Sequence, residues 1–177
     1  DAQEALDFTR LAYDISEEFD TPVILRATTR LSHTRSPVFT GPRETPEDKP
    51  FIDDPGKNVV LPAVARVRHP FVVEREARLQ AYFEASPLTR WEKGETTFGI
   101  ITNGTSYPYV KEVVPNASIL KLASSYPLAK KNVREFCDSV DRVLVVEELE
   151  PFIETEVLAM GIKAEGKEFF SRCGEFS

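Results

Sequence analysis

One turn in the sequence has residue types that could bind a phosphate. Asn103-Gly104-Thr105-Ser106 follows a short apolar run and precedes a helical pattern. At such a turn, backbone N–H groups and the helix dipole can hold an anion. A single glycine, however, is neither a GxGxxG fingerprint nor a Walker-type loop. The turn therefore leaves two interpretations open, a phosphate site and an ordinary strand-to-helix connection, and we favour the connection.

Three carboxylates, Glu147, Glu148 and Glu150, follow a second apolar run. The carboxyl end of a strand is where α/β sheets usually carry their functional residues. Paired carboxylates could bind a metal or act as general acid and base. Acidic residues at a helix start are also stabilised by the helix dipole. We favour this structural interpretation and keep the catalytic one as the alternative.

Histidine and basic residues supply the remaining candidates. His33 follows the predicted strand end Thr28–Ser32 and could titrate near neutral pH, although a surface or interface histidine is favoured. The basic run 66–69 predicts an anchor against an acidic neighbouring surface, with an anion site as the alternative. Because the chain has only two histidines and two cysteines, no zinc or iron–sulfur ligand set is predicted.

The elements that must position these residues alternate between strand and helix from residue 97 to residue 163. Strands are predicted at 97–102, 118–122 and 142–146, and helices at 107–114 and from Pro151 to Gly161. Another helix is predicted from an apolar stripe at helical spacing, which comprises Leu128, Val133, Phe136, Cys137 and Val140. The pattern predicts an α/β fold with a mostly parallel sheet and helices on both faces.

The preceding residues predict less regular structure. Residues 3–19 read as an amphipathic helix, 23–29 as a strand, 35–70 as a Pro-rich linker and 70–85 as a helix, with Trp91 in a loop. In the last helix the buried positions are expected to be Val73, Ala77, Tyr82 and Phe83. These patterns divide the chain into a terminal αβ unit at 1–34, a linker and helix at 35–96, and an α/β domain at 97–177.

The first predicted helix has an apolar face that one strand cannot cover. This face consists of Phe8, Leu11, Ile15 and Phe19. A lone helix of this length is marginal in water, and one added strand makes no sheet. We therefore expect the face to pack against the later domain or to cause self-association of the chain.

Composition limits the class of protein. The net charge of −7 over 177 residues argues against a general nucleic-acid binder, and no apolar run is long enough to span a membrane. With two cysteines a disulfide framework is not expected, which favours a cytoplasmic protein. The sequence begins at Asp1 without methionine, so we expect a piece of a longer polypeptide.

Several segments resemble the alpha subunit of indolepyruvate:ferredoxin oxidoreductases. Residues 3–5 and 22–33 are similar to the end of its pyrimidine-binding domain, and Val145–Glu154 is the longest run similar to its middle domain. Shorter similar runs are 84–90, 99–104, 126–128 and 172–175. Residues 97–166 also resemble, more remotely, the transketolase C-terminal domain of thiamine-diphosphate enzymes.

The resemblance implies an enzyme that oxidatively decarboxylates aryl pyruvates to aryl-acetyl-CoA and reduces ferredoxin. The full enzyme would use thiamine diphosphate, Mg²⁺ and [4Fe–4S] clusters, and would pair this alpha subunit with a beta subunit. No catalytic residue or cofactor is expected in this chain, because the activating glutamate, the GDG-type motif and the cysteine motifs of the family are absent from it. Only Arg30, Ser32 and His33 match residues near the family's cofactor cleft.

Two function classes therefore stand. The first is a structural and subunit-interaction module of a thiamine-dependent oxidoreductase. The second is an independent nucleotide- or CoA-binding α/β domain that would use the 103–106 turn and the carboxylates after residue 146.

Overall fold

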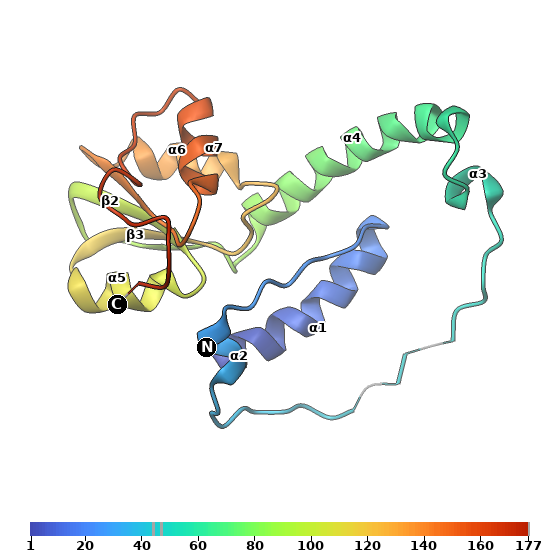
Figure 1. Ribbon diagram of the computed structural model, residues 1–177, viewed down its shortest axis with the longest axis horizontal. Helices are drawn as coiled ribbons and strands as arrows, with labels where there is room; N and C mark the ends of the chain where they lie inside the picture. Colours follow the sequence, from blue (N-terminus) through green and yellow to red (C-terminus); the bar gives the residue numbers. More distant parts are fainter. Residues whose placement is uncertain (44, 47, 177) are drawn as a thin grey trace. The chain divides into compact units, whose positions relative to one another are not determined.

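The computed structural model describes residues 1–43, 45–46 and 48–176. The chain divides into two compact units, Asp1–Arg75 and Glu76–Ser177, which we call unit 1 and unit 2. Figure 1 follows the chain through its helices and strands. The predicted division at residues 34 and 96 remains a prediction about the longer protein.

Unit 2 is built on a four-stranded sheet with strand order β1-β3-β2-β4. Its strands are β1 (Arg90–Glu92), β2 (Glu95–Asn103), β3 (Ala117–Leu122) and β4 (Val143–Val146). The central strand β2 pairs in parallel with β3 and β4, whereas β1 pairs antiparallel with β3. The predicted mostly parallel sheet is confirmed. The loop assignment of Trp91 was wrong, since Trp91 pairs with Leu120 across the sheet.

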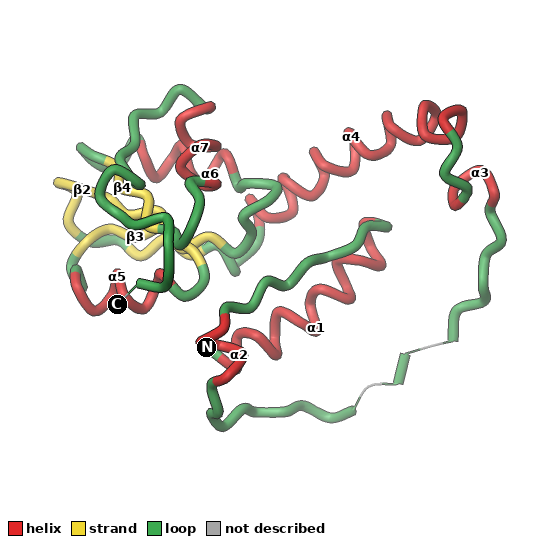
Figure 2. The backbone as a smooth tube through the Cα atoms, in the orientation of Figure 1, coloured by secondary structure: helices red, strands yellow, loops and turns green. Residues whose placement is uncertain are grey.

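Helices cover both faces of this sheet, as predicted. Figure 2 shows α5 (Ser106–Val113) on the opposite side from α6 (Lys130–Cys137) and α7 (Phe152–Ala159). The core on the α5 side includes Ile100, Val110, Ala117, Ile119 and Val146. The core on the other side includes Ile101, Leu120, Val133, Phe136, Val145, Ile153 and Val157. Neighbouring residues of each strand thus enter opposite cores, as the two-residue strand period requires.

Gly99 allows the aromatic ring of Phe136 to approach the central strand. A Cβ atom added at Gly99 would lie 2.7 Å from the ring of Phe136 and 2.9 Å from Val140. The ring also makes an edge-on contact with Trp91, with ring centroids 5.7 Å apart. The stripe predicted from sequence therefore packs where it was expected, with Val133, Phe136 and Cys137 buried.

In unit 1 the predicted first helix is present as α1 (Ala2–Phe19), in which Ile15 and Phe19 are buried. The strand predicted at 23–29 was wrong. Residues 22–28 have no regular structure, and Thr29–His33 forms the short helix α2. The hydroxyl oxygen of Thr28 accepts a hydrogen bond from the Leu31 N–H at 3.3 Å and so starts this helix. A strand needs a partner strand, and the described part of unit 1 contains none.

The fourth helix also differs from the expectation. The linker is irregular up to the short helix α3 (Pro55–Asn58), but α4 runs from Pro62 to Ala85 and includes Pro70. Proline is tolerated in the first turn of a helix, which explains the start at Pro62. Val73 and Ala77, predicted to be buried, are exposed, and α4 has no buried residue.

We expect Cys137 to react slowly with thiol reagents. It is 8% exposed, and burial raises the pKa of its thiol from 9.0 to about 11, whereas Cys173 is exposed. The thiolate is the reactive form, so a maleimide should label Cys137 at least about a hundredfold more slowly than Cys173 in the folded protein. Mass spectrometry of labelled peptides measures both rates. In urea the two rates should become similar; equal rates in the native protein would contradict the position of α6.

Candidate functional site

The candidate site is the edge of the sheet where the parallel strands β2, β3 and β4 end. The chain passes from β2 through α5 to β3 on one side, and then through α6 on the other face to β4. In such sheets ligands bind where the strand order reverses, here between the carboxyl ends of β2 and β4. The 103–106 turn follows β2 and Glu147 follows β4, so the fold places two of the predicted groups at this edge.

The turn after β2 is a connection held by one backbone hydrogen bond and one side-chain hydrogen bond. Gly104 has a positive φ of 49°, and the Tyr107 N–H donates to its carbonyl oxygen at 3.4 Å. The Asn103 amide donates to the Ser125 hydroxyl at 2.9 Å and links this turn to the loop after β3. Ser106 is buried, with 2% of its surface exposed. The turn has the geometry of the favoured strand-to-helix connection, and the phosphate site remains a prediction.

Glu147 is a buried carboxylate that starts helix α7. Its two oxygens accept hydrogen bonds from the backbone N–H groups of Ile153 and Glu154, each at 2.9 Å. Only 5% of Glu147 is exposed. Burial raises the pKa of its carboxyl, while the two backbone hydrogen bonds oppose the increase. Both oxygens are therefore already engaged by the helix, which supports the structural interpretation.

The segment after α7 closes the same edge. The Lys167 ammonium group donates to the carbonyl oxygen of Glu147, and the Lys167 N–H donates to the Glu154 carboxylate at 2.9 Å. Glu150 is exposed and pairs with Arg172 at 3.7 Å. The three predicted acids thus do not form one group: Glu147 bonds to the start of α7, Glu150 pairs with Arg172, and Glu148 is half-buried. In the described part of the chain, no group of three or more His, Cys, Asp or Glu residues is placed to hold a metal ion.

The residues matched to the cofactor cleft lie in unit 1. Arg30, Ser32 and His33 are exposed and share the five-residue helix α2 rather than a strand end. Their predicted position at the end of a strand was therefore wrong. Their role in lining a cleft remains a prediction.

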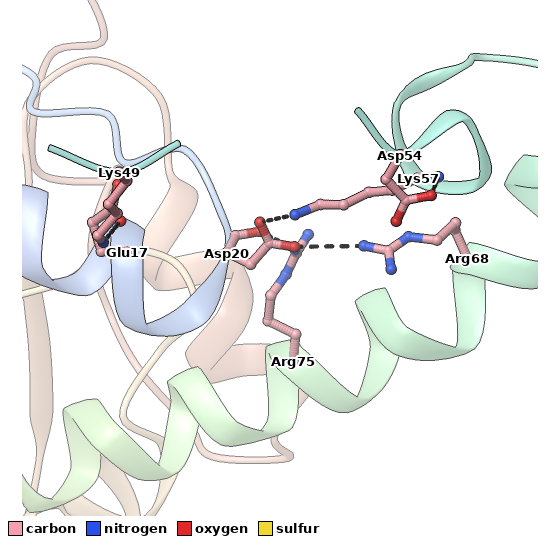
Figure 3. Close-up of polar contacts among 7 residues, drawn as sticks. All are labelled: Glu17, Asp20, Lys49, Asp54, Lys57, Arg68 and Arg75. Carbon is pink, nitrogen blue, oxygen red and sulfur yellow. Dashed lines mark hydrogen bonds and ion pairs between the residues drawn. The ribbon is translucent and has the colours of Figure 1, made fainter. Parts of the chain in front are cut away.

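The basic run 66–69 contributes to an ion-pair cluster around Asp20, the residue at the end of α1 (Figure 3). The Asp20 carboxylate lies 2.5 Å from the Lys57 ammonium and 3.5 Å from the Arg68 guanidinium. Arg75 donates to the carbonyl oxygen of Asp20. The hydrogen bond from Lys57 is the main cause that lowers the pKa of Asp20. Arg68 therefore pairs with an acidic residue of the same unit, and the anchoring of the whole run against an acidic neighbouring surface remains a prediction.

Two hollows of about 260 Å³ each lie elsewhere in unit 2. One is lined by residues of α4 and α6, including Glu84, Lys131 and Asn132. The other lies beside the outer edge of β4, where the Arg142 guanidinium donates to both carboxylate oxygens of Glu165 at 2.7–2.9 Å. The pairing of Glu165 with β4 was missed by the sequence analysis, because a single bridge leaves no periodic pattern.

We expect Glu147→Gln to destabilise unit 2 by about 1–2 kcal/mol at neutral pH, because the amide NH₂ cannot accept one of the two helix N–H bonds. Urea unfolding followed by the fluorescence of Trp91 measures the change. Burial raises the pKa of Glu147 in the folded protein above its value in the unfolded chain. The contribution of Glu147 to the free energy of unfolding is therefore fully present below the pKa of the unfolded chain, and it is lost as the pH rises through the pKa of the folded protein.

Glutamine does not titrate, so the stability difference between the wild type and Glu147→Gln should be larger at about pH 5 than at about pH 8. Glu148→Gln, at the neighbouring half-buried acid, is the matched control and should change stability by less than about 0.5 kcal/mol. A variant as stable as the wild type at both pH values would contradict the capping role.

The curated proteins that are similar to this chain are described by the same name, indolepyruvate oxidoreductase subunit IorA. The chain is 39% identical over 166 residues to the indolepyruvate oxidoreductase subunit IorA of Archaeoglobus fulgidus, covering 90% of this chain and 27% of that protein. It is 37% identical to the same subunit of Pyrococcus horikoshii, covering 99% of this chain and 30% of the relative. The match to the Methanothermobacter thermautotrophicus subunit is 38%, over 90% of this chain and 27% of the relative. No protein-family model matches the chain.

Among solved structures, a 2-oxoglutarate:ferredoxin oxidoreductase from Magnetococcus marinus, determined with 2-oxoglutarate, coenzyme A and succinyl-CoA bound, is similar in fold. The TM-score is 0.51 at 18% identity, and the match covers 65% of this chain and 21% of that one. This match supports the α/β fold class. The chain therefore belongs to the same sequence family as the IorA subunits of indolepyruvate oxidoreductases, and it spans less than a third of the length of these relatives.

Proposed function

We propose that the chain is a structural and subunit-interaction segment of a thiamine-diphosphate-dependent indolepyruvate:ferredoxin oxidoreductase. The observation that carries the proposal is sequence identity of 37% over 99% of the chain with an IorA subunit. The proposed reaction of the full enzyme is oxidative decarboxylation of aryl pyruvates to aryl-acetyl-CoA with reduction of ferredoxin, in the cytoplasm. The proposed partner is the beta subunit of the same enzyme.

The donor groups of this chain do not fit the cofactors of that reaction. A [4Fe–4S] cluster takes about four cysteine ligands, and the sequence has two cysteines, of which Cys137 is buried in the core of unit 2. The buried carboxylate Glu147 is engaged by backbone N–H groups. We therefore assign thiamine diphosphate, Mg²⁺ and the clusters to other parts of the full enzyme, and no step of the reaction to residues of this chain.

The contribution we assign to this chain is to provide a rigid scaffold. The parallel strands of unit 2 are covered on both faces. At their carboxyl ends the Asn103–Ser125 hydrogen bond joins the loops after β2 and β3, and the Ile153–Glu147 hydrogen bond fixes the start of α7 to the end of β4. Such an edge can hold neighbouring domains in fixed positions without itself binding a substrate.

In the described residues, no helix combines the length and apolar character needed to cross a membrane.

A chimera tests the proposal. The matching segment of the Pyrococcus horikoshii subunit would be replaced by this chain, and the beta subunit of that enzyme would be co-expressed. We expect the chimera to assemble with the beta subunit on size-exclusion chromatography and to reduce ferredoxin with indolepyruvate and CoA. Assembly without any activity would contradict the scaffolding role, and failure to assemble, with unit 2 folded by circular dichroism, would contradict the interaction role.

The same chimera tests the cleft residues. His33→Ala should lower kcat without changing assembly if α2 lies beside the cofactor in the full enzyme. Arg35→Gln, at an exposed residue just beyond α2, is the matched control and should leave kcat unchanged. Equal activities of the His33→Ala variant and the unmodified chimera would remove His33 from the proposed cleft.

The alternative, an independent CoA- or nucleotide-binding domain, is tested on the chain alone. Calorimetry with CoA, ATP and thiamine diphosphate with Mg²⁺ should show no binding in the micromolar range. Micromolar binding that is lost in Asn103→Ala would instead favour a site at the 103–106 turn.

A further inference from the structure

The C-terminal part of α4 carries three polar residues that connect it to the start of α6. The part of α4 that belongs to unit 2 begins at Glu76. Glu76, Gln80 and Glu84 follow one another at four-residue spacing and therefore lie on one side of the helix. The Tyr126 hydroxyl donates to the Glu76 carboxylate at 2.5 Å, and the Lys131 N–H donates to the Glu84 carboxylate at 3.0 Å. This polar stripe thus contacts the loop after β3 and the first turn of α6.

Helix α6 has no capping side chain at its own N-cap position. The residue there is Ala129, whose methyl group cannot accept a hydrogen bond. A serine, threonine, asparagine or aspartate at this position would accept from the second or third N–H of the helix. Lys131 is the second residue of α6, and its N–H donates to Glu84 instead. Glu84 therefore provides, from 47 residues earlier in the chain, the acceptor that the N-cap residue lacks.

The contact between the two helices is incompletely packed at this place. A hollow of about 260 Å³ lies beside it, and its lining residues are Ala81, Glu84 and Ala85 of α4 and Lys131, Asn132 and Glu135 of α6. The Gln80 amide donates to the same oxygen of Glu84 at 3.0 Å and so holds the carboxylate in position. Because the hollow removes apolar contacts, the contact of α4 with α6 relies here on the hydrogen bond of Glu84.

We propose that Glu84 is a positioning residue that caps α6 from α4 and so fixes α6 over the sheet. Helix α6 places Phe136 against the central strand and buries Cys137. The loop before α6 contains Ser125, which accepts a hydrogen bond from Asn103 at the candidate site. A fixed start of α6 therefore also holds this loop at the carboxyl edge of the sheet. The inference rests on the fold of unit 2 and not on the proposed enzyme.

The rate at which a maleimide labels Cys137 in the full chain tests the cap, because this buried thiol reacts when α6 opens. We expect Glu84→Ala to raise the rate about fivefold, the effect of a lost cap on the opening equilibrium. Glu84→Gln keeps an oxygen that can accept from the Lys131 N–H, so its rate should stay within about twofold of the wild type.

Glu135→Ala is the matched control for these variants. Glu135 lines the same hollow, but its carboxylate pairs with the exposed Lys131 ammonium at 4.0 Å, and such pairs contribute little. Its labelling rate should therefore equal that of the wild type. Circular dichroism and Trp91 fluorescence check that each variant is folded.

Hydrogen exchange separates capping from a general loss of stability. In Glu84→Ala the amides of residues 130–137 should exchange faster, while those of Ile100 and Ile101 keep their wild-type rates. In the wild type, slow exchange of the Lys131 amide measures the bond without any substitution. A wild-type labelling rate in Glu84→Ala, an equal increase in Glu84→Gln, or an equal increase in exchange at Ile100 would overturn the proposal. A wild-type Lys131 amide that exchanges as in an unfolded chain would do the same.

Discussion

The arrangement of unit 2 depends on the parallel pairing of β2 with both of its neighbours. The crossover through α5 joins β2 to β3, and the crossover through α6 passes over the other face of the sheet to β4, so both faces of β2 are covered by helices. Ile100 and Ile101 enter opposite cores because of the two-residue strand period, and each is almost completely buried. The close approach of Phe136 to Gly99 fixes the position of α6 over the same strand. The carboxyl ends of β2 and β4, and therefore the candidate site, are placed by this pairing.

This dependence explains which parts of the fold were predictable from sequence. The runs around Ile100, Ile119 and Val145 are apolar without alternation because their strands are covered on both faces, and their partners lie within the same unit. The stripe of α6 was predictable for the same reason. By contrast, Val23, Ile24 and Leu25 have the composition of a strand, but Ile24 is 90% exposed and unit 1 offers no partner strand among its described residues. Local propensity cannot form a strand without its partner.

At the candidate site the sequence could place residues but could not tell which of two roles they have. A carboxylate after a strand and before a helix suits both catalysis and helix capping, and only the hydrogen bonds of Glu147 distinguish the two. Similarly, the sequence placed Arg68 in a basic run, but its partner Asp20 is 48 residues earlier, and no periodic pattern connects them. Pairings between distant polar residues leave no periodic signal, whereas apolar periodicity survives in a single sequence.

The two units differ in how they are stabilised. Unit 2 buries two apolar clusters, whereas the buried apolar residues of unit 1 are Ile15 and Phe19. Unit 1 is also joined by ion pairs such as Lys57–Asp20, in which both side chains are about half exposed, and exposed pairs of this kind contribute little free energy. Phe39, Phe51 and Val60 are each more than 85% exposed. Because burial of apolar surface is the dominant favourable term in folding, the described residues of unit 1 gain much less free energy from this term than unit 2 does.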